Sequence, residues 1–67
     1  MIQVQLNGKG TESKPDMPLF EFLDQEQLNP KLIAIEYNGE ILHRQHWEGK
    51  KLSEGDRLEI VTIVGGG

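Results

Sequence analysis

The chain has 67 residues, which is long enough for one small domain. Its formal net charge is −4, and it contains no cysteine. A domain near this size buries only about 60% of the surface that its unfolded chain exposes, which leaves little material for a deep catalytic cavity. The acidic balance argues against a nucleic-acid binder, which needs a basic face, and the lack of cysteine excludes disulfides and thiolate metal sites. We find neither a signal peptide nor an apolar stretch of membrane-spanning length. We therefore expect a cytoplasmic protein without a membrane partner.

The first residues have a pattern typical of a β-hairpin. Apolar and polar residues alternate over residues 2–6, as they do in a strand with one buried face. The following Asn7-Gly8 is a dipeptide that tolerates the positive backbone angles of a tight hairpin turn. We therefore predict a second, less apolar strand over residues 11–14.

A single helix is predicted next. Asp16 can accept hydrogen bonds from the first free amides of a helix, and Pro18 suits its first turn. The helix is expected over residues 19–28, because Asn29-Pro30 cannot continue it. Its apolar face would comprise Leu19, Phe20, Phe22, Leu23 and Leu28.

The second half of the chain predicts three more strands. Residues 32–37 form an apolar strand, Asn38-Gly39 signals a second tight turn, and residues 40–42 form a short return strand. Residues 53–56 read as another turn, with Ser53 ordering it. The last strand, residues 57–64, is the longest β-branched run in the chain.

This order of elements predicts an α+β fold of the β-grasp (ubiquitin-like) kind. The one helix must cover the apolar face of one mixed sheet of four to five strands, because no other element can. The strand 57–64 belongs in the centre of that sheet, where both of its edges are paired. We assign residues 1–64 to this domain and residues 65–67 to a flexible glycine tail.

The side chains offer no catalytic constellation. His43 and His46 lie three apart but lack further ligands, so no metal site is predicted. Ser13 and Ser53 have no base and orienting group beside them, and Glu54 and Asp56 read as turn residues and solvated charge. We expect a non-enzyme that binds no cofactor itself, and no Walker-type motif for ATP is present.

Trp47 lies in the least regular part of the chain, residues 43–49, where a single helical turn is expected. Tryptophan is enriched in binding hot spots, so this side chain could anchor a partner. With only four aromatic residues in the chain, however, we favour a place in the hydrophobic core.

Three consecutive glycines, Gly65, Gly66 and Gly67, end the sequence. They could be a disordered end or a cloning scar. However, the strongly predicted last strand leads directly into the glycines, with no polar linker between them. Without β-carbons, such a tail can thread a channel too narrow for other residues, and three extended residues reach roughly 10 Å. The Gly67 carboxylate could then be adenylated and attacked by a sulfur nucleophile, which gives a thiocarboxylate.

The last strand also predicts a docking surface beside the glycines. Side chains alternate along a strand, so Val61 and Ile63 point away from the inward Leu58 and Ile60. Together with Val64 they would form an apolar patch next to the tail. We expect this patch to dock on partner proteins.

The whole chain resembles the ThiS family, the sulfur carriers of bacterial thiamine biosynthesis. The resemblance rests on the order and spacing of VQLNG at 4–8, YNGEIL at 37–42, RQHW at 44–47, EGDRLEIV at 54–61 and VGGG at 64–67. It implies a monomeric carrier rather than an enzyme. Gly67 would be the modified residue, passing through a glycyl adenylate to 1-thioglycine, with Gly65 and Gly66 threading into the partner.

The resemblance also implies the partners. An E1-like adenylyltransferase would activate Gly67 with ATP and Mg²⁺, a cysteine desulfurase relay would supply sulfur, and thiazole synthase would receive it. The small subunit of molybdopterin synthase shares this tail and activation chemistry and is one alternative. A ubiquitin-like modifier joined to lysines is another, and a non-covalent binding module is a third.

Overall fold

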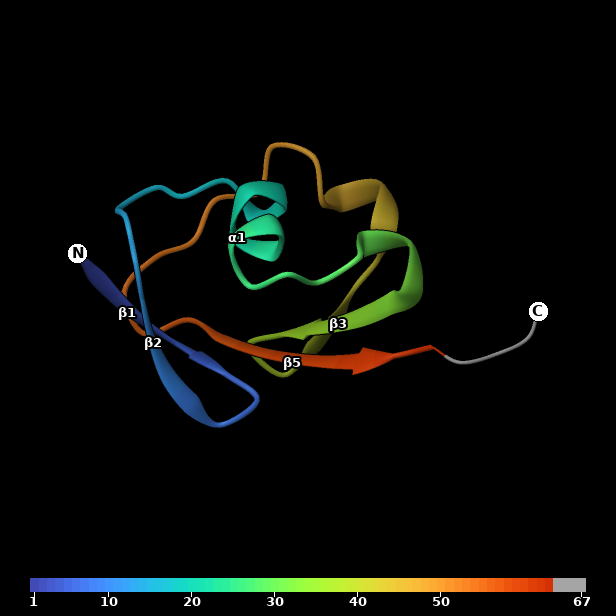
Figure 1. Ribbon diagram of the computed structural model, residues 1–67, viewed down its shortest axis with the longest axis horizontal. Coiled ribbons are helices and arrows are strands. Elements are labelled where there is room, and N and C mark those ends of the chain that lie inside the picture. Colours follow the sequence, from blue (N-terminus) through green and yellow to red (C-terminus); the bar gives the residue numbers. More distant parts are fainter. Residues whose placement is uncertain (64–67) are drawn as a thin grey trace.

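One helix lies across one face of a five-stranded sheet in the computed structural model, which describes residues 1–63 (Figure 1). The predicted roles of Val64, Gly65, Gly66 and Gly67 therefore lie outside the described residues. The strands follow the spatial order β2-β1-β5-β3-β4. Their bounds are β1 Ile2–Leu6, β2 Lys9–Ser13, β3 Ile33–Tyr37, β4 Glu40–Leu42 and β5 Arg57–Thr62, and the helix α1 spans Leu19–Gln25.

The pairing of the strands confirms the predicted β-grasp. β1 pairs with β2 and β3 pairs with β4 in antiparallel hairpins. β5 lies between the two hairpins, parallel to β1 and antiparallel to β3. The longest strand, β5, is thus central, as expected. A strand with a neighbour on each edge can pair its backbone N–H and C=O groups on both sides.

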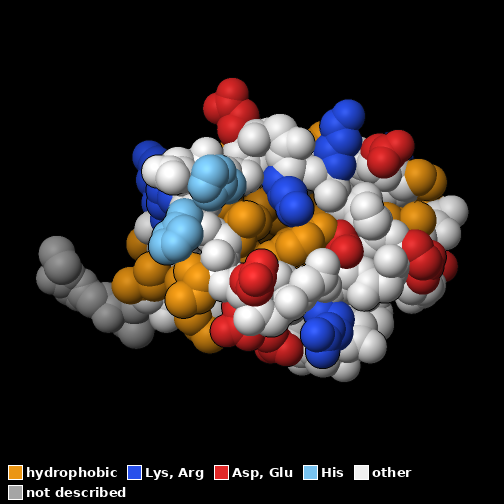
Figure 2. Space-filling model, turned by 180° about the vertical axis from the view of Figure 1, so that it is seen from behind, with side chains coloured by type: hydrophobic (Ala, Val, Ile, Leu, Met, Phe, Trp, Pro, Cys, Tyr) orange, Lys and Arg blue, Asp and Glu red, His pale blue; other side chains and the backbone are white. Residues whose placement is uncertain are grey.

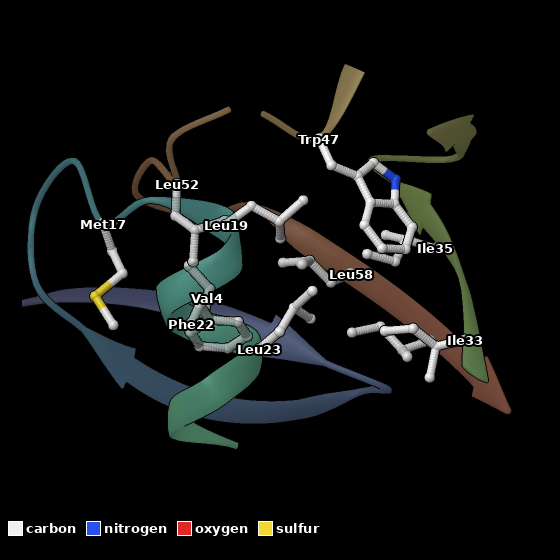
Figure 3. Packing of buried hydrophobic residues seen from close by; sticks show 11 residues of the cluster. Val4, Met17, Leu19, Phe22, Leu23, Ile33, Ile35, Trp47, Leu52 and Leu58 are labelled. Atoms are coloured by element: carbon white, nitrogen blue, oxygen red, sulfur yellow. The ribbon is translucent and has the colours of Figure 1, made fainter. Parts of the chain in front are cut away.

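The hydrophobic core fills the space between the helix and the sheet (Figure 3). The helix contributes three fully buried side chains, and Trp47, 2% exposed, closes one end of the core, as predicted. The core residues are Val4, Met17, Leu19, Phe22, Leu23, Ile33, Ile35, Trp47, Leu52, Leu58 and Ile60. The predicted turn beneath Trp47 is the short 3-10 helix η2 (Arg44–His46).

Both Asn-Gly turns hold the central strand from its two sides. Asn7 accepts a hydrogen bond at its Oδ1 from the Ile60 amide, 2.7 Å, and Asn38 accepts one from the Arg57 amide, 2.8 Å. Both asparagines have positive φ, the left-handed conformation that the turn prediction requires. Each turn therefore closes its own hairpin and also fixes that hairpin against β5.

The helix differs from the prediction at both ends. Asp16 does not cap it: Asp16 itself has φ +56°, and Pro18 is the N-terminal flanking residue, without a side-chain cap. The helix ends at Gln25 rather than at residue 28, because Gln27 adopts φ +59° and the Leu28 amide bonds back to the Leu23 carbonyl, 2.8 Å. This is the Schellman arrangement, and it leaves Leu28 packed against the core from outside the helix.

Two strand starts and one side chain also differ from the prediction. The second strand begins at Lys9, because a two-residue turn pairs Lys9 directly with Leu6. The third begins at Ile33, because the 3-10 helix η1 (Pro30–Leu32) precedes it, with Asn29 Oδ1 accepting from the Lys31 amide. Phe20, predicted inward, is 44% exposed and stands edge-on to Trp47.

Candidate functional site

The last described residue, Ile63, is fixed to the sheet. Its amide donates a 2.6 Å hydrogen bond to the Leu32 carbonyl, directly after the pair Ile33–Thr62. The ladder of β3 and β5 therefore extends to the point where the glycine-containing segment begins. Any partner that acts on residues 64–67 must approach this end of the sheet.

Apolar side chains gather on the sheet face that the helix leaves uncovered. Val61 and Ile63, the two predicted patch residues, are 61% and 53% exposed, so their outward orientation is confirmed. Their neighbours Ile41 and Leu32 are 70% and 50% exposed. Together with Ala34, which pairs with Val61, these residues form what we call the apolar patch: Leu32, Ala34, Ile41, Val61 and Ile63.

The patch is hollowed rather than flat. One hollow of about 260 Å³ is lined by Ala34, Ile35, Glu36, Ile41, Glu59 and Val61. A second, of about 200 Å³, extends from Ile41 and Ile63 to the residues around Trp47. In Figure 2, hydrophobic side chains (orange) lie next to the histidines (pale blue). Hollows of this size suit single side chains of a protein partner rather than a small-molecule substrate.

Trp47 and Arg44 build the rim of the second hollow. The buried indole donates from Nε1 to the Leu42 carbonyl, 2.8 Å, which fixes the ring behind β4. The Arg44 guanidinium lies 4.5 Å from the ring centroid, in cation–π geometry. Arg44 is thereby held beside the patch and remains exposed.

Asp56 is buried, contrary to the expectation of a solvated turn charge. It is 8% exposed and accepts hydrogen bonds from the Ser53 amide, Asn38 Nδ2 and the Tyr37 hydroxyl. Asp56, rather than Ser53, therefore orders the turn before β5. Burial, with the hydrogen bond and charge of Asp56 adding to it, raises the pKa of the Tyr37 phenol above its usual range.

This network fixes the register of the patch. Tyr37 ends β3, Asn38 begins the turn that follows it, and Asp56 directly precedes β5, so their contacts align the two strands. That alignment places Ala34 opposite Val61. A slip by one residue would turn the apolar side chains to the other face.

The remaining sequence candidates form no second site. His43 and His46 are exposed, and residues 1–63 contain no group of three or more histidine, aspartate or glutamate side chains placed to hold a metal ion. Ser13 is buried and donates its hydroxyl hydrogen to the neighbouring Lys14 carbonyl. Within the described part of the chain, no helix has the length and hydropathy that crossing a membrane requires.

The fold and this face define a small β-grasp protein with an exposed apolar patch at the end of its central strand. The chain belongs to the ThiS family of sulfur carrier proteins, whose family model matches residues 4–67. It is 37% identical to the sulfur carrier protein ThiS of Bacillus subtilis over 65 residues, which is 96% of this chain and 98% of that protein. Its members are described as sulfur carrier proteins.

Two further comparisons concern a solved structure and a longer enzyme. The crystal structure of the thiamine biosynthesis protein ThiS from Geobacter metallireducens superposes with a TM-score of 0.84 at 25% identity, covering 98% of this chain and 100% of that one. A thiazole synthase of Paramagnetospirillum magneticum is 27% identical over 66 residues. That match covers 98% of this chain but only 20% of the synthase.

Proposed function

We propose that this chain is the sulfur carrier for thiamine thiazole synthesis, with the Gly67 carboxylate as the group that carries sulfur. Its membership of the ThiS family is the observation on which the proposal rests. The chain acts as a co-substrate: it supplies a terminal carboxylate, and partner enzymes supply catalysis. We expect it to act in the cytoplasm together with these enzymes.

Activation begins on an E1-like adenylyltransferase. A Gly67 carboxylate oxygen attacks the α-phosphorus of ATP, and Mg²⁺-bound pyrophosphate leaves. The resulting glycyl adenylate has AMP as its leaving group, whereas the free carboxylate would have to expel oxide. ATP and Mg²⁺ belong to the partner enzyme.

Sulfur is then loaded by a cysteine desulfurase relay. It arrives as sulfide, or as a persulfide whose sulfur–sulfur bond a second thiol cleaves afterwards. In either case the sulfur attacks the carbonyl carbon, AMP leaves, and a terminal thiocarboxylate (1-thioglycine) remains at Gly67. A thiazole synthase then takes the sulfur. The thiazole synthase of Paramagnetospirillum magneticum, part of which resembles this whole chain, supports that choice of recipient.

The sheet face supplies the binding energy for this exchange. Residues 64–67 can reach at most about 14 Å beyond Ile63, so a partner that receives Gly67 must cover the neighbouring surface. We propose that Val61 and Ile63, continued by Val64, dock on the adenylating enzyme. Gly65 and Gly66 have no side chains to obstruct a narrow channel, and they deliver Gly67 to its active site.

The test is adenylation of the purified chain. Incubation with the adenylating enzyme, ATP and Mg²⁺ should release pyrophosphate in proportion to the carrier. A chain that lacks Gly67 and a chain whose Gly67 ends in an amide should release none, although their folded domain is unchanged. Pyrophosphate release from either altered chain would contradict the role of the terminal carboxylate.

A further inference from the structure

Two carboxylates lie directly opposite each other beside the apolar patch. Glu36 of β3 is the cross-strand partner of Glu59 of β5, and both side chains are exposed on the face that carries Val61. Directly opposite residues have Cβ atoms only about 5 Å apart, and like charges in this position destabilise a sheet. The chain therefore keeps an unfavourable pair in the middle of its open face.

The surroundings of this pair do not neutralise it. On the other side of Glu36, the cross-strand partner is the exposed Ile41. Arg57, two residues before Glu59 on the same strand face, supplies one positive charge against two negative ones. These three charged residues, which we call the acidic row, thus carry a net negative charge, as does the whole chain, with its net charge of −4.

The pair also borders a hollow. Glu36 and Glu59 line the hollow of about 260 Å³, and its other walls are apolar. A long side chain with an apolar stem and a cationic end fits such a site, because the stem contacts Ile41 and Val61 while the charge meets both carboxylates. Arginine fits best, since its planar guanidinium can donate to two carboxylates at once.

We propose that the apolar patch docks on a partner protein whose contact surface is apolar in the centre and inserts an arginine or lysine side chain between Glu36 and Glu59. This inference rests on the proposed function, because the partner we expect is the E1-like adenylating enzyme. The pair then lowers the stability of the free carrier and is compensated only in the complex. It also sets the orientation of docking, with the acidic row held on one side and Arg44 on the other.

The experiment compares two variants of equal charge. E36Q/E59Q removes the pair, and E21Q/E48Q removes two exposed carboxylates at other places. Pyrophosphate release is measured against carrier concentration with the adenylating enzyme, at low and at high salt. We expect E36Q/E59Q to raise KM about tenfold at unchanged kcat and to lose most of the salt dependence of KM, while the control stays near wild type.

Thermal unfolding supplies the second measurement. Because E36Q/E59Q removes a repulsion, its melting temperature should equal or exceed that of wild type, so misfolding cannot explain a raised KM. A KM for E36Q/E59Q equal to that of the control, with wild type adenylated normally, contradicts this inference alone. A wild-type chain that is not adenylated contradicts the proposed function.

Discussion

The two halves of the open sheet face differ in character although both face solvent. On β1 and β2, the outward residues are polar: Gln3 and Glu12 are cross-strand partners joined by a 3.3 Å hydrogen bond, and Gln5 lies beside them. On β3, β4 and β5 the outward residues include the exposed Ile41, Val61 and Ile63. Stability alone would favour polar residues on both halves.

The two halves therefore differ in the chemical type of the side chains that they expose to water. Contiguous exposed apolar surface on a small soluble protein marks an interaction site. The apolar half is also the half that ends at Ile63, where the C-terminal segment begins. The polar half thus serves as an internal control for the apolar half, in the same sheet and the same molecule.

The largest expected effect is a loss of folding stability when the contacts that align β3 with β5 in the apolar half are removed. Asp56→Ala leaves the Ser53 amide and the Tyr37 hydroxyl without their acceptor. We expect the free energy of unfolding to fall by about 2–4 kcal/mol in urea denaturation. Glu54→Ala, which removes an exposed acceptor of the Gln3 amide, should cost less than about 1 kcal/mol. Equal losses for the two variants would show that Asp56 does not hold the strands in register.

A smaller effect, on the affinity for the adenylating enzyme, compares the two halves directly. Val61→Ser with Ile63→Ser should weaken binding to the adenylating enzyme by about 2–3 kcal/mol, or roughly 30- to 150-fold, in a titration calorimetry experiment. Gln3→Ser with Gln5→Ser, the matched pair on the polar half, should leave the affinity unchanged. Folding of both double variants should stay within about 1 kcal/mol of wild type, because all four side chains are exposed. Equal affinities would make the apolar patch only a structural feature.

The smallest effect concerns Tyr37. Tyr37→Phe removes one hydrogen bond to Asp56 and should cost about 1 kcal/mol at neutral pH. The ring contact with Lys50 Nζ, 4.3 Å from the centroid, can remain. The variant therefore isolates the hydroxyl group.

The same residue predicts a pH dependence. The pKa of the Tyr37 phenol is raised in the folded state. The protonated phenol therefore contributes its full stabilisation below about pH 10, the pKa of Tyr in the unfolded chain, and this stabilisation is lost as the pH rises further. Urea midpoints measured from pH 8 to alkaline pH should fall more steeply for wild type than for Tyr37→Phe. Parallel curves would contradict a raised pKa of the Tyr37 phenol in the folded state.

Much of the fold could be predicted from the sequence because its signals are local. The Asn-Gly dipeptides at 7–8 and 38–39 locate both hairpins, and period-two alternation identifies the inward and outward residues of β5. The end of the helix could not be predicted, because nothing in the type of residue at Gln27 requires a left-handed conformation. It follows from the way Leu28 reaches the core.

The site was only partly predictable, because it depends on register. Val61 and Ile63 follow from alternation within one strand. Ile41 and Leu32 join them only through cross-strand alignment, as does the opposition of Glu36 and Glu59. Asp56 is likewise buried only because the turn at Asn38 and the turn at Ser53, which lie far apart in the sequence, pack against each other. The roles of Gly65, Gly66 and Gly67 remain predictions from the sequence and the family.

Intact mass spectrometry of the chain recovered from cells tests the central claim most directly. If Gly67 carries sulfur, part of the population should be heavier by about 16 Da, the difference between a sulfur and an oxygen atom. That increase should lie on the C-terminal fragment and be absent from a chain ending in Gly66. A recovered wild-type chain that never shows this exchange, in cells that are making thiamine, would contradict the account.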